Sequence, residues 1–197
     1  MSNKSIMGPT EMGSVKDFEV HISLKENWKP FHARNRGGDS QSETVEMGKQ
    51  IQELWSKGFI EVSNSGVSSN LKMAPKPGSD KLRLCTNYWK ANKEIQDLDI
   101  PMPGMESILG KLGNASLFTV IDLRQGFWQL PLARKDRWIT AFKAPMGLFQ
   151  WKVLPFGLKT APALFAQAIP KMLGPEYEDR DLRMLHGPTE SFAVACR

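Results

Sequence analysis

Cysteine is scarce in this chain, which has only Cys85 and Cys196 among its 197 residues. Two cysteines so far apart provide neither a metal-binding framework nor a disulfide scaffold. The three histidines, His21, His32 and His186, also lack the spacing of zinc ligands. These absences argue against a disulfide-stabilised secreted domain and a zinc module, and they favour a reducing, intracellular compartment.

Long apolar runs are missing as well. No stretch of eighteen apolar residues occurs, and the N-terminus Met1-Ser-Asn-Lys-Ser5 does not open a signal peptide. We therefore expect a chain that does not enter a membrane. With 41% hydrophobic residues the chain is able to bury a core, and its length suggests one domain or a fragment of a larger protein.

The net charge of +5 is modest, but positive charge is concentrated between residues 72 and 93, where Asp80 is the one acidic residue. The basic residues of this stretch are Lys72, Lys76, Lys81, Arg83, Lys90 and Lys93. Such a strip either faces nucleic-acid phosphates, with Lys72 and Lys81 as candidate contacts, or is the solvated surface of a hairpin.

Local signals predict the first elements. Ser40 and Glu43 have the spacing of a capping box, and apolar residues recur on one face up to the stop at Lys57 and Gly58, so we expect a helix over residues 41–57. A short strand should follow over 59–62. Two further strands should flank the turn-rich residues 75–80 and form a basic hairpin.

The second half predicts a short helix over 105–112, a strand over 117–123 and an alternating strand over 148–153. Thr160 is a candidate N-cap for the last helix. Pro170 lacks a backbone donor and crowds the preceding turn, so it predicts a kink or an early end of that helix.

Asp122 ends the apolar strand that carries Phe118 and Val120 on the same face. A carboxylate fixed at a strand end suits a hard cation such as Mg²⁺, which prefers oxygen ligands and keeps several waters. A single strand-terminal aspartate also caps turns or pairs with a nearby arginine such as Arg124. The residue alone leaves both interpretations open.

Several motifs follow one another in a recognisable order. They are Ile51-Gln-Glu-Leu-Trp-Ser-Lys-Gly-Phe-Ile60, Ser68-Ser-Asn-Leu-Lys72, Arg83-Leu-Cys-Thr-Asn-Tyr88 with Asn92-Lys93, Ile121-Asp-Leu-Arg-Gln-Gly-Phe127, Thr140-Ala-Phe142, Leu154-Pro-Phe-Gly-Leu158 and Ala161-Pro162 with Phe165. Together the run from Trp28 to Met172 resembles the fingers and palm of a reverse transcriptase of the gypsy class of LTR retrotransposons.

The resemblance implies that Asp122 is catalytic and binds Mg²⁺ or Mn²⁺, with the backbone carbonyl of Leu123 as a further ligand. It also implies that Arg83 contacts the triphosphate of the incoming nucleotide, aided by Lys76. The alternative for Arg83 is a plain surface arginine on the hairpin. Substrates would be deoxynucleoside triphosphates and an RNA or DNA template-primer.

Phe127 matches the family position whose ring lies under the sugar and excludes a 2′-hydroxyl. Phe156 and Gly157 match the loop beside the nucleotide, where glycine permits close backbone approach. For Phe127, ordinary core packing is the competing interpretation.

The family completes its metal site with a Tyr-x-Asp-Asp hairpin, which would fall near residue 184, yet Met184-Leu-His186 stands there. The run from Tyr177 to Asp181 looks similar, but it comes early and Arg180 separates its acids, so we interpret it as a solvated turn. The residues from Asp181 to Arg197 depart from the family, as a frameshift, a degraded element or a mis-joined gene would produce.

We therefore expect an α+β fold with an antiparallel sheet packed on helices. Residues 1–39 should form an N-terminal arm or loop, 40–175 the fingers and partial palm, and 176–197 a divergent tail. The expected function is that of a reverse transcriptase fragment of a retrotransposon polyprotein, inactive alone because the second acidic motif is missing. The alternatives are a non-catalytic nucleic-acid-binding remnant and an unstable pseudogene product, in which half a palm sheet leaves an unpaired edge and exposed apolar surface.

Overall fold

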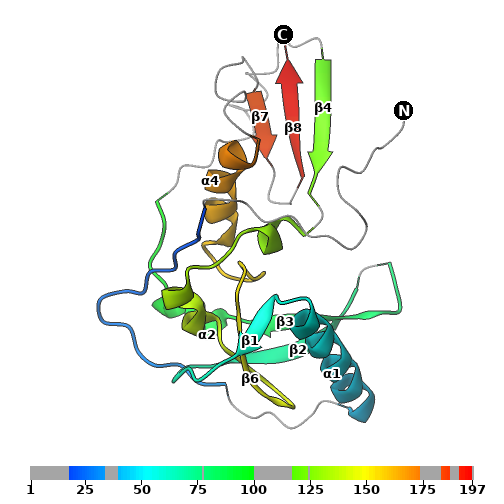
Figure 1. Ribbon diagram of the computed structural model, residues 1–197, viewed down its shortest axis with the longest axis vertical. Coiled ribbons are helices and arrows are strands. Elements are labelled where there is room, and N and C mark those ends of the chain that lie inside the picture. The colour runs from blue at the N-terminus through cyan, green and yellow to red at the C-terminus, as the bar shows by residue number, and fades with distance from the viewer. Residues whose placement is uncertain are drawn as a thin grey trace.

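The computed structural model describes residues 18–33, 40–76, 78–99, 117–123, 125–173, 183–186 and 191–196. Its strands form two sheets, a five-stranded sheet in the order β1-β6-β5-β2-β3 and a three-stranded sheet in the order β4-β8-β7. Figure 1 shows the two sheets at opposite ends of the molecule, with helix α4 between them. The expected α+β fold is confirmed.

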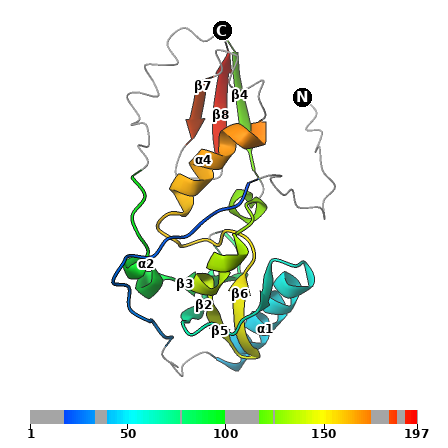
Figure 2. The same cartoon turned by 60° about the vertical axis from the view of Figure 1, so that its left-hand side comes forward.

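The five-stranded sheet is mostly antiparallel, and β2 and β5 form its one parallel pair. Its strands are β1 (Ile60–Val62), β2 (Ser69–Pro75), β3 (Leu82–Asn87), β5 (Phe142–Ala144) and β6 (Gly147–Trp151). Helix α1 packs against this sheet through Met47, Ile51 and Leu54, and Figure 2 shows it beside β6 and β5.

Helix α1 (Gln41–Ser56) begins as predicted from the capping box. The Glu43 backbone N–H donates to Ser40 Oγ at 3.2 Å, and the Ser40 N–H donates to Glu43 Oε2 at 2.7 Å. That second bond holds the pKa of Glu43 below its ordinary value. The helix ends one residue earlier than expected, and Gly58 follows with a φ of +75°.

Strands β2 and β3 form the predicted hairpin. Their register places Lys72 opposite Cys85 and Ala74 opposite Arg83. Strand β3 is an edge strand, and Gln50 of α1 covers part of that edge: its Nε2 donates to the Leu82 carbonyl and its Oε1 accepts from the Leu84 N–H. These bonds satisfy backbone groups that would otherwise be free for another strand.

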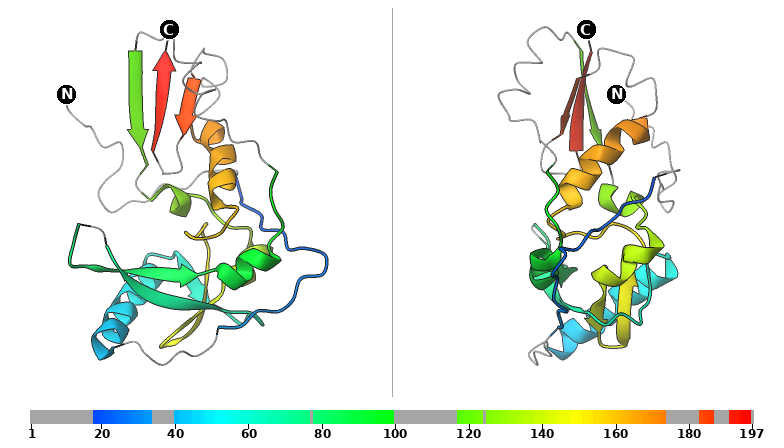
Figure 3. Two further views of the ribbon diagram at one scale, coloured as in Figure 1. Left: turned by 180° about the vertical axis from the view of Figure 1, so that it is seen from behind. Right: turned by 90° about the vertical axis from the view of Figure 1, so that its left-hand side faces the viewer.

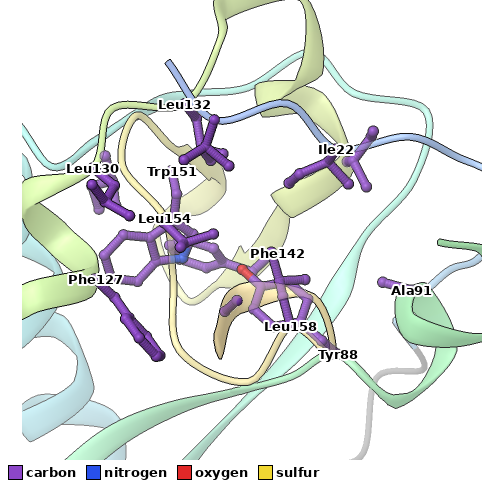
Figure 4. Packing of buried hydrophobic residues seen from close by; sticks show 14 of the residues in the cluster. Ile22, Tyr88, Ala91, Phe127, Leu130, Leu132, Phe142, Trp151, Leu154 and Leu158 are labelled. Carbon is purple, nitrogen blue, oxygen red and sulfur yellow. The ribbon is translucent and has the colours of Figure 1, made fainter. Parts of the chain in front are cut away.

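The core lies where helix α2 (Trp89–Glu94) and the 3-10 helices η1 (Gly126–Gln129) and η2 (Arg134–Thr140) meet the sheet. Figure 4 shows Leu130, Leu154 and Phe142 packed there, and all three are 0% exposed. Tyr88 is buried among them and its hydroxyl donates to the Thr140 carbonyl at 3.0 Å. Burial raises the pKa of Tyr88, so the phenol remains a neutral donor.

Residues 18–33 form an extended strap, drawn in blue in Figure 3. Val20 bridges to Leu132 and Leu24 bridges to Ile95, while the Phe31 carbonyl accepts from the Ser68 N–H at 2.9 Å. The strap therefore connects η2, α2 and β2. The sequence placed these residues in an arm packed on the domain or leading into it, and the structure shows that this part of the arm is packed.

Helix α4 (Ala161–Leu173) corrects two expectations. It continues three residues past Pro170, so the expected early end is wrong; Ala168 and Ile169, both at most 1% exposed, hold that turn in the core. Thr160 is 4% exposed, and its Oγ1 has no hydrogen-bond partner, although its carbonyl accepts from the Leu164 N–H. The Thr160 side chain therefore does not cap the helix.

The C-terminal residues form strands that the sequence did not predict. Strands β7 (Arg183–His186) and β8 (Ser191–Cys196) are antiparallel, and β8 pairs along the whole of β4 (Leu117–Asp122). Strand β4 therefore has a partner on one side, and among the described residues it remains an edge strand of its sheet. The pseudogene interpretation, which assumes an unpaired edge, stays a prediction. The helix expected over 105–112 and the acidic run 177–181 lie outside the described residues.

Among the helices in the described part of the chain, none is long and apolar enough to span a bilayer.

The strap generates a stability prediction. Val20 is 1% exposed, so Val20→Ala should lower the free energy of unfolding by about 2 kcal/mol, because it leaves a cavity against Leu132. Val62→Ala is the matched control, since Val62 is 62% exposed and should change stability by less than about 0.5 kcal/mol. Urea unfolding followed by circular dichroism compares them, and equal effects would show that the strap lies outside the cooperative core.

Candidate nucleotide and nucleic-acid site

Asp122 is the last residue of β4, where its backbone lies opposite Ser191 of β8. Directly after it, Leu123 packs against the core and Gln125 adopts a left-handed φ of 52° before η1 begins. This turn follows the predicted catalytic aspartate within three residues and brings Phe127 into the core. The expected placement of Asp122 at a strand end is confirmed at the level of the backbone.

A two-metal site holds its cations about 3.5–4 Å apart and needs several carboxylates. Within the residues that the structure describes, no group of three or more histidine, cysteine, aspartate or glutamate side chains is placed to hold a metal ion. The roles of Asp122 and Leu123 as ligands of Mg²⁺ or Mn²⁺ therefore stay predictions.

An aromatic cluster stands beyond this turn. The ring centroid of Phe127 lies 5.1 Å from that of Phe156 and 5.1 Å from that of Phe165. Phe127 is 9% exposed and Phe156 is 45% exposed. The structure thus brings together two residues that the sequence assigned to nucleotide binding. Phe156 presents the open ring, while Phe127 packs in the core, as its core-packing interpretation expects. The role of Phe127 beside the sugar stays a prediction.

Gly126 makes this packing possible. A Cβ atom at Gly126 would lie 2.8 Å from the Phe165 ring, closer than real Cβ contacts allow. Helix α4 therefore approaches η1 closely enough for Phe165 to meet Phe127 only because residue 126 has no side chain.

Asn92 fixes the loop that carries Phe156 and Gly157. Its Nδ2 donates to the Gly157 carbonyl at 2.9 Å, and its Oδ1 accepts from the Lys159 N–H at 2.9 Å. Lys159 Nζ lies 2.6 Å from Asp97, and this hydrogen bond holds the pKa of Asp97 below its ordinary value. The motif containing Asn92 was visible in the sequence, but the hydrogen-bonding role of its side chain was not.

Gly157 has a φ of +92°, a conformation that favours glycine. A Cβ atom there would lie 3.5 Å from both the Thr86 carbonyl and the Tyr88 ring. The loop therefore approaches the end of β3 closely, and the predicted nucleotide-side loop and the basic hairpin adjoin one another.

The β2–β3 hairpin presents the predicted cations on one face. Side chains alternate along a strand, so Lys72 and Arg83 share the exposed face, while Leu71, Met73 and Leu84 turn toward the core. Lys76 and Lys81 are exposed at the tip, where the Lys76 N–H donates to the Lys81 carbonyl at 2.9 Å. We call Lys72, Lys76, Lys81 and Arg83 the basic face.

Comparison with known proteins identifies the family of this chain. Residues 74–186, more than half of the chain, match the family described as "Reverse transcriptase (RNA-dependent DNA polymerase)". The chain belongs to the reverse transcriptase family. The family resemblance inferred from the motifs is confirmed.

Relatives come from viruses and transposons. The genome polyprotein of Petunia vein clearing virus (isolate Hohn) is 36% identical over 165 residues, which are 81% of this chain and 8% of that protein. The Pol polyproteins of the Drosophila melanogaster transposons 297 and gypsy are 36% and 33% identical over 69% and 63% of this chain. These matches cover 13% and 12% of the two polyproteins, so this reverse transcriptase chain corresponds to a small part of each relative.

The fold is also that of a solved reverse transcriptase. A crystal structure of the Prototype Foamy Virus protease-reverse transcriptase (CSH mutant) matches with a TM-score of 0.76 at 22% identity. The match covers 94% of this chain and 24% of the viral chain.

The Asn92 contacts generate a prediction about dynamics. Asn92→Ala removes the acceptor of the Lys159 N–H and the donor to Gly157, so the amides of residues 156–159 should exchange with solvent at least tenfold faster. Hydrogen–deuterium exchange read by mass spectrometry measures this change. Asn64→Ala is the control, since Asn64 is exposed outside this loop. Unchanged exchange in Asn92→Ala would show that the loop is fixed by other contacts.

Proposed function

We propose that this chain is the part of a reverse transcriptase domain that grips the template-primer and receives the incoming deoxynucleoside triphosphate. In the reaction of the intact family, the primer 3′-hydroxyl attacks the α-phosphate, the new phosphodiester bond forms and pyrophosphate leaves. Bound Mg²⁺ or Mn²⁺ supplies charge neutralisation on the phosphate oxygens in that reaction. We assign binding, rather than polymerisation, to the isolated chain.

The single observation that carries this proposal is the basic face. Four cations project from one hairpin, and the register of β2 with β3 places Lys72 and Arg83 on the same exposed side. Among the described residues, none of these four side chains has an acidic partner within 4.0 Å. Unneutralised cations on a rigid element suit a phosphate backbone.

Arg83 and Lys76 are the residues we assign to the triphosphate. A guanidinium forms two parallel hydrogen bonds with phosphate oxygens, whereas an ammonium acts as a point charge. Phe156, supported by Phe127, would contact the sugar, and Gly157 lets the backbone approach it. Asn92 orients this loop as a positioning residue.

We assign no processive polymerase activity to the chain alone, because its sequence has Met184-Leu-His186 where the family has its second acidic motif, and two cations require several carboxylates. The second candidate function, template-directed synthesis by this chain itself, is favoured by the pairing of β4 with β8, which gives the strand that ends at Asp122 a partner along its whole length. The two candidates differ in primer extension.

The binding function generates a salt-dependence prediction. Replacing Lys72, Lys76 and Arg83 by glutamine should weaken binding to a labelled RNA–DNA hybrid. It should also make the negative slope of log K against log salt shallower by about two to three, because fewer counterions are released. Fluorescence anisotropy between 50 and 200 mM salt measures this slope. A triple variant of exposed lysines elsewhere, Lys25, Lys57 and Lys135, loses the same charge and should keep the slope. Binding that does not respond to salt contradicts the proposal.

The catalytic alternative is tested by primer extension on an RNA template with Mg²⁺. We expect neither the wild-type chain nor Asp122→Asn to extend the primer. Extension by the wild-type chain together with its loss in Asp122→Asn would overturn the assignment and make Asp122 a catalytic residue of a complete site.

A further inference from the structure

Trp128 packs beside the exposed ring of Phe156. It is half-buried in η1, and its ring centroid lies 5.9 Å from that of Phe156. Phe127, the preceding residue of η1, meets the same ring at 5.1 Å. Two consecutive residues of η1 therefore form an aromatic seat for Phe156, and we use that name for the rings of Phe127 and Trp128.

The two rings of the aromatic seat are fixed by different parts of the fold. Phe127 meets a ring of α4 at 5.1 Å. Trp128 instead lies 5.2 Å from Phe59, which joins α1 to β1, and 5.4 Å from Trp151 of β6. Aromatic pairs at such separations are stabilising. The Phe156 ring therefore rests where the five-stranded sheet meets α4, and Trp128 is its contact on the side of the sheet.

The backbone on either side of Phe156 is anchored without these rings. The Leu154 N–H donates to the Leu130 carbonyl at 2.9 Å, and the Gly157 carbonyl accepts from Asn92 Nδ2 at 2.9 Å. These two hydrogen bonds fix the path of the loop, but they do not fix the rotation of the Phe156 side chain about its own bonds. The rings against which Phe156 packs restrict that rotation.

Trp128 is itself held relative to β4 by the turn that follows Asp122. Gln125 adopts a φ of 52°, which is uncommon for a residue with a side chain, and its carbonyl accepts from the Trp128 N–H at 2.9 Å. The backbone of Trp128 is therefore tied to the strand that ends at Asp122.

The indole nitrogen of Trp128 is buried and has no hydrogen-bond partner among the described residues. A buried donor without a partner costs free energy, and a phenylalanine at this position would avoid that cost. What the indole adds over a phenyl ring is reach, because it spans from Phe59 to Phe156.

We propose that Trp128 is a positioning residue for the incoming deoxynucleoside triphosphate. It orients the Phe156 ring against the sugar and connects that ring to the five-stranded sheet, which carries the basic face. Its effect on the nucleotide passes through Phe156. The inference rests on the proposed function, since Phe156 is the residue that we assign to the sugar.

The test measures equilibrium binding of labelled dTTP with Mg²⁺ to the full-length chain, on an adenylate RNA template whose DNA primer ends in a dideoxynucleotide. Trp128→Phe should weaken dTTP binding about fivefold, the effect of losing one aromatic contact. Trp138→Phe is the matched control, because Trp138 is also half-buried in a 3-10 helix but packs on Trp28 at 5.4 Å. It should change the affinity by less than about twofold.

Thermal unfolding and a double-mutant cycle separate positioning from a loss of stability. Both phenylalanine variants should unfold within about 4 °C of the wild-type chain. In a chain that carries Phe156→Leu, the addition of Trp128→Phe should change dTTP affinity by less than about twofold, because the ring on which Trp128 acts is already absent.

If the wild-type chain binds dTTP and Trp128→Phe behaves like Trp138→Phe, the positioning role is wrong and the proposed function stands. A loss of affinity that persists undiminished in the Phe156→Leu chain also overturns the role, since Trp128 would then act without Phe156. If the wild-type chain binds the template-primer but no dTTP, the nucleotide-binding part of the proposed function fails, and the positioning role fails with it.

Discussion

The register of β2 with β3 is the constraint on which the functional surfaces depend. Lys72 opposite Cys85 and Ala74 opposite Arg83 place the cations outside, while Leu71 and Met73 reach the core. A slip by one residue would exchange the two faces and bury the charges. Gln50 secures this register from α1, because its amide bonds to both Leu82 and Leu84 of the edge strand.

Long-range contacts then bring the remaining surfaces to this hairpin. The strap positions His32 beside Lys90, and Asn92 holds the loop of Gly157 against the end of β3. Phe165 packs on Phe127 because Gly126 has no side chain, which fixes the aromatic cluster relative to α4. The basic face and the nucleotide-side loop are therefore brought together around β2 and β3 by segments distant in the sequence.

The elements that could be predicted from the sequence are those whose ends are fixed by residues close together in the sequence. The capping box at Ser40 starts α1, and the turn residues after Pro75 close the hairpin. The family motifs assigned Phe127 and Phe156 to the surroundings of the same nucleotide, and the structure places their ring centroids 5.1 Å apart. The packing of the strap was not predicted in detail, because residues 18–33 have no periodicity and Val20 pairs with Leu132, more than a hundred residues away in the sequence. Strand β8 was missed for a similar reason, since its pairing with β4 is long-range and its sequence departs from the family motif.

The most direct test of the account is footprinting of the full-length chain with and without a single-stranded RNA, using hydroxyl radicals and mass spectrometry. The account predicts protection of strands β2 and β3, with Lys72 and Arg83 inside the protected stretch, and no change at Trp55 on α1. Protection of α1 or the strap alone, with the β2–β3 hairpin equally reactive in both states, would contradict it.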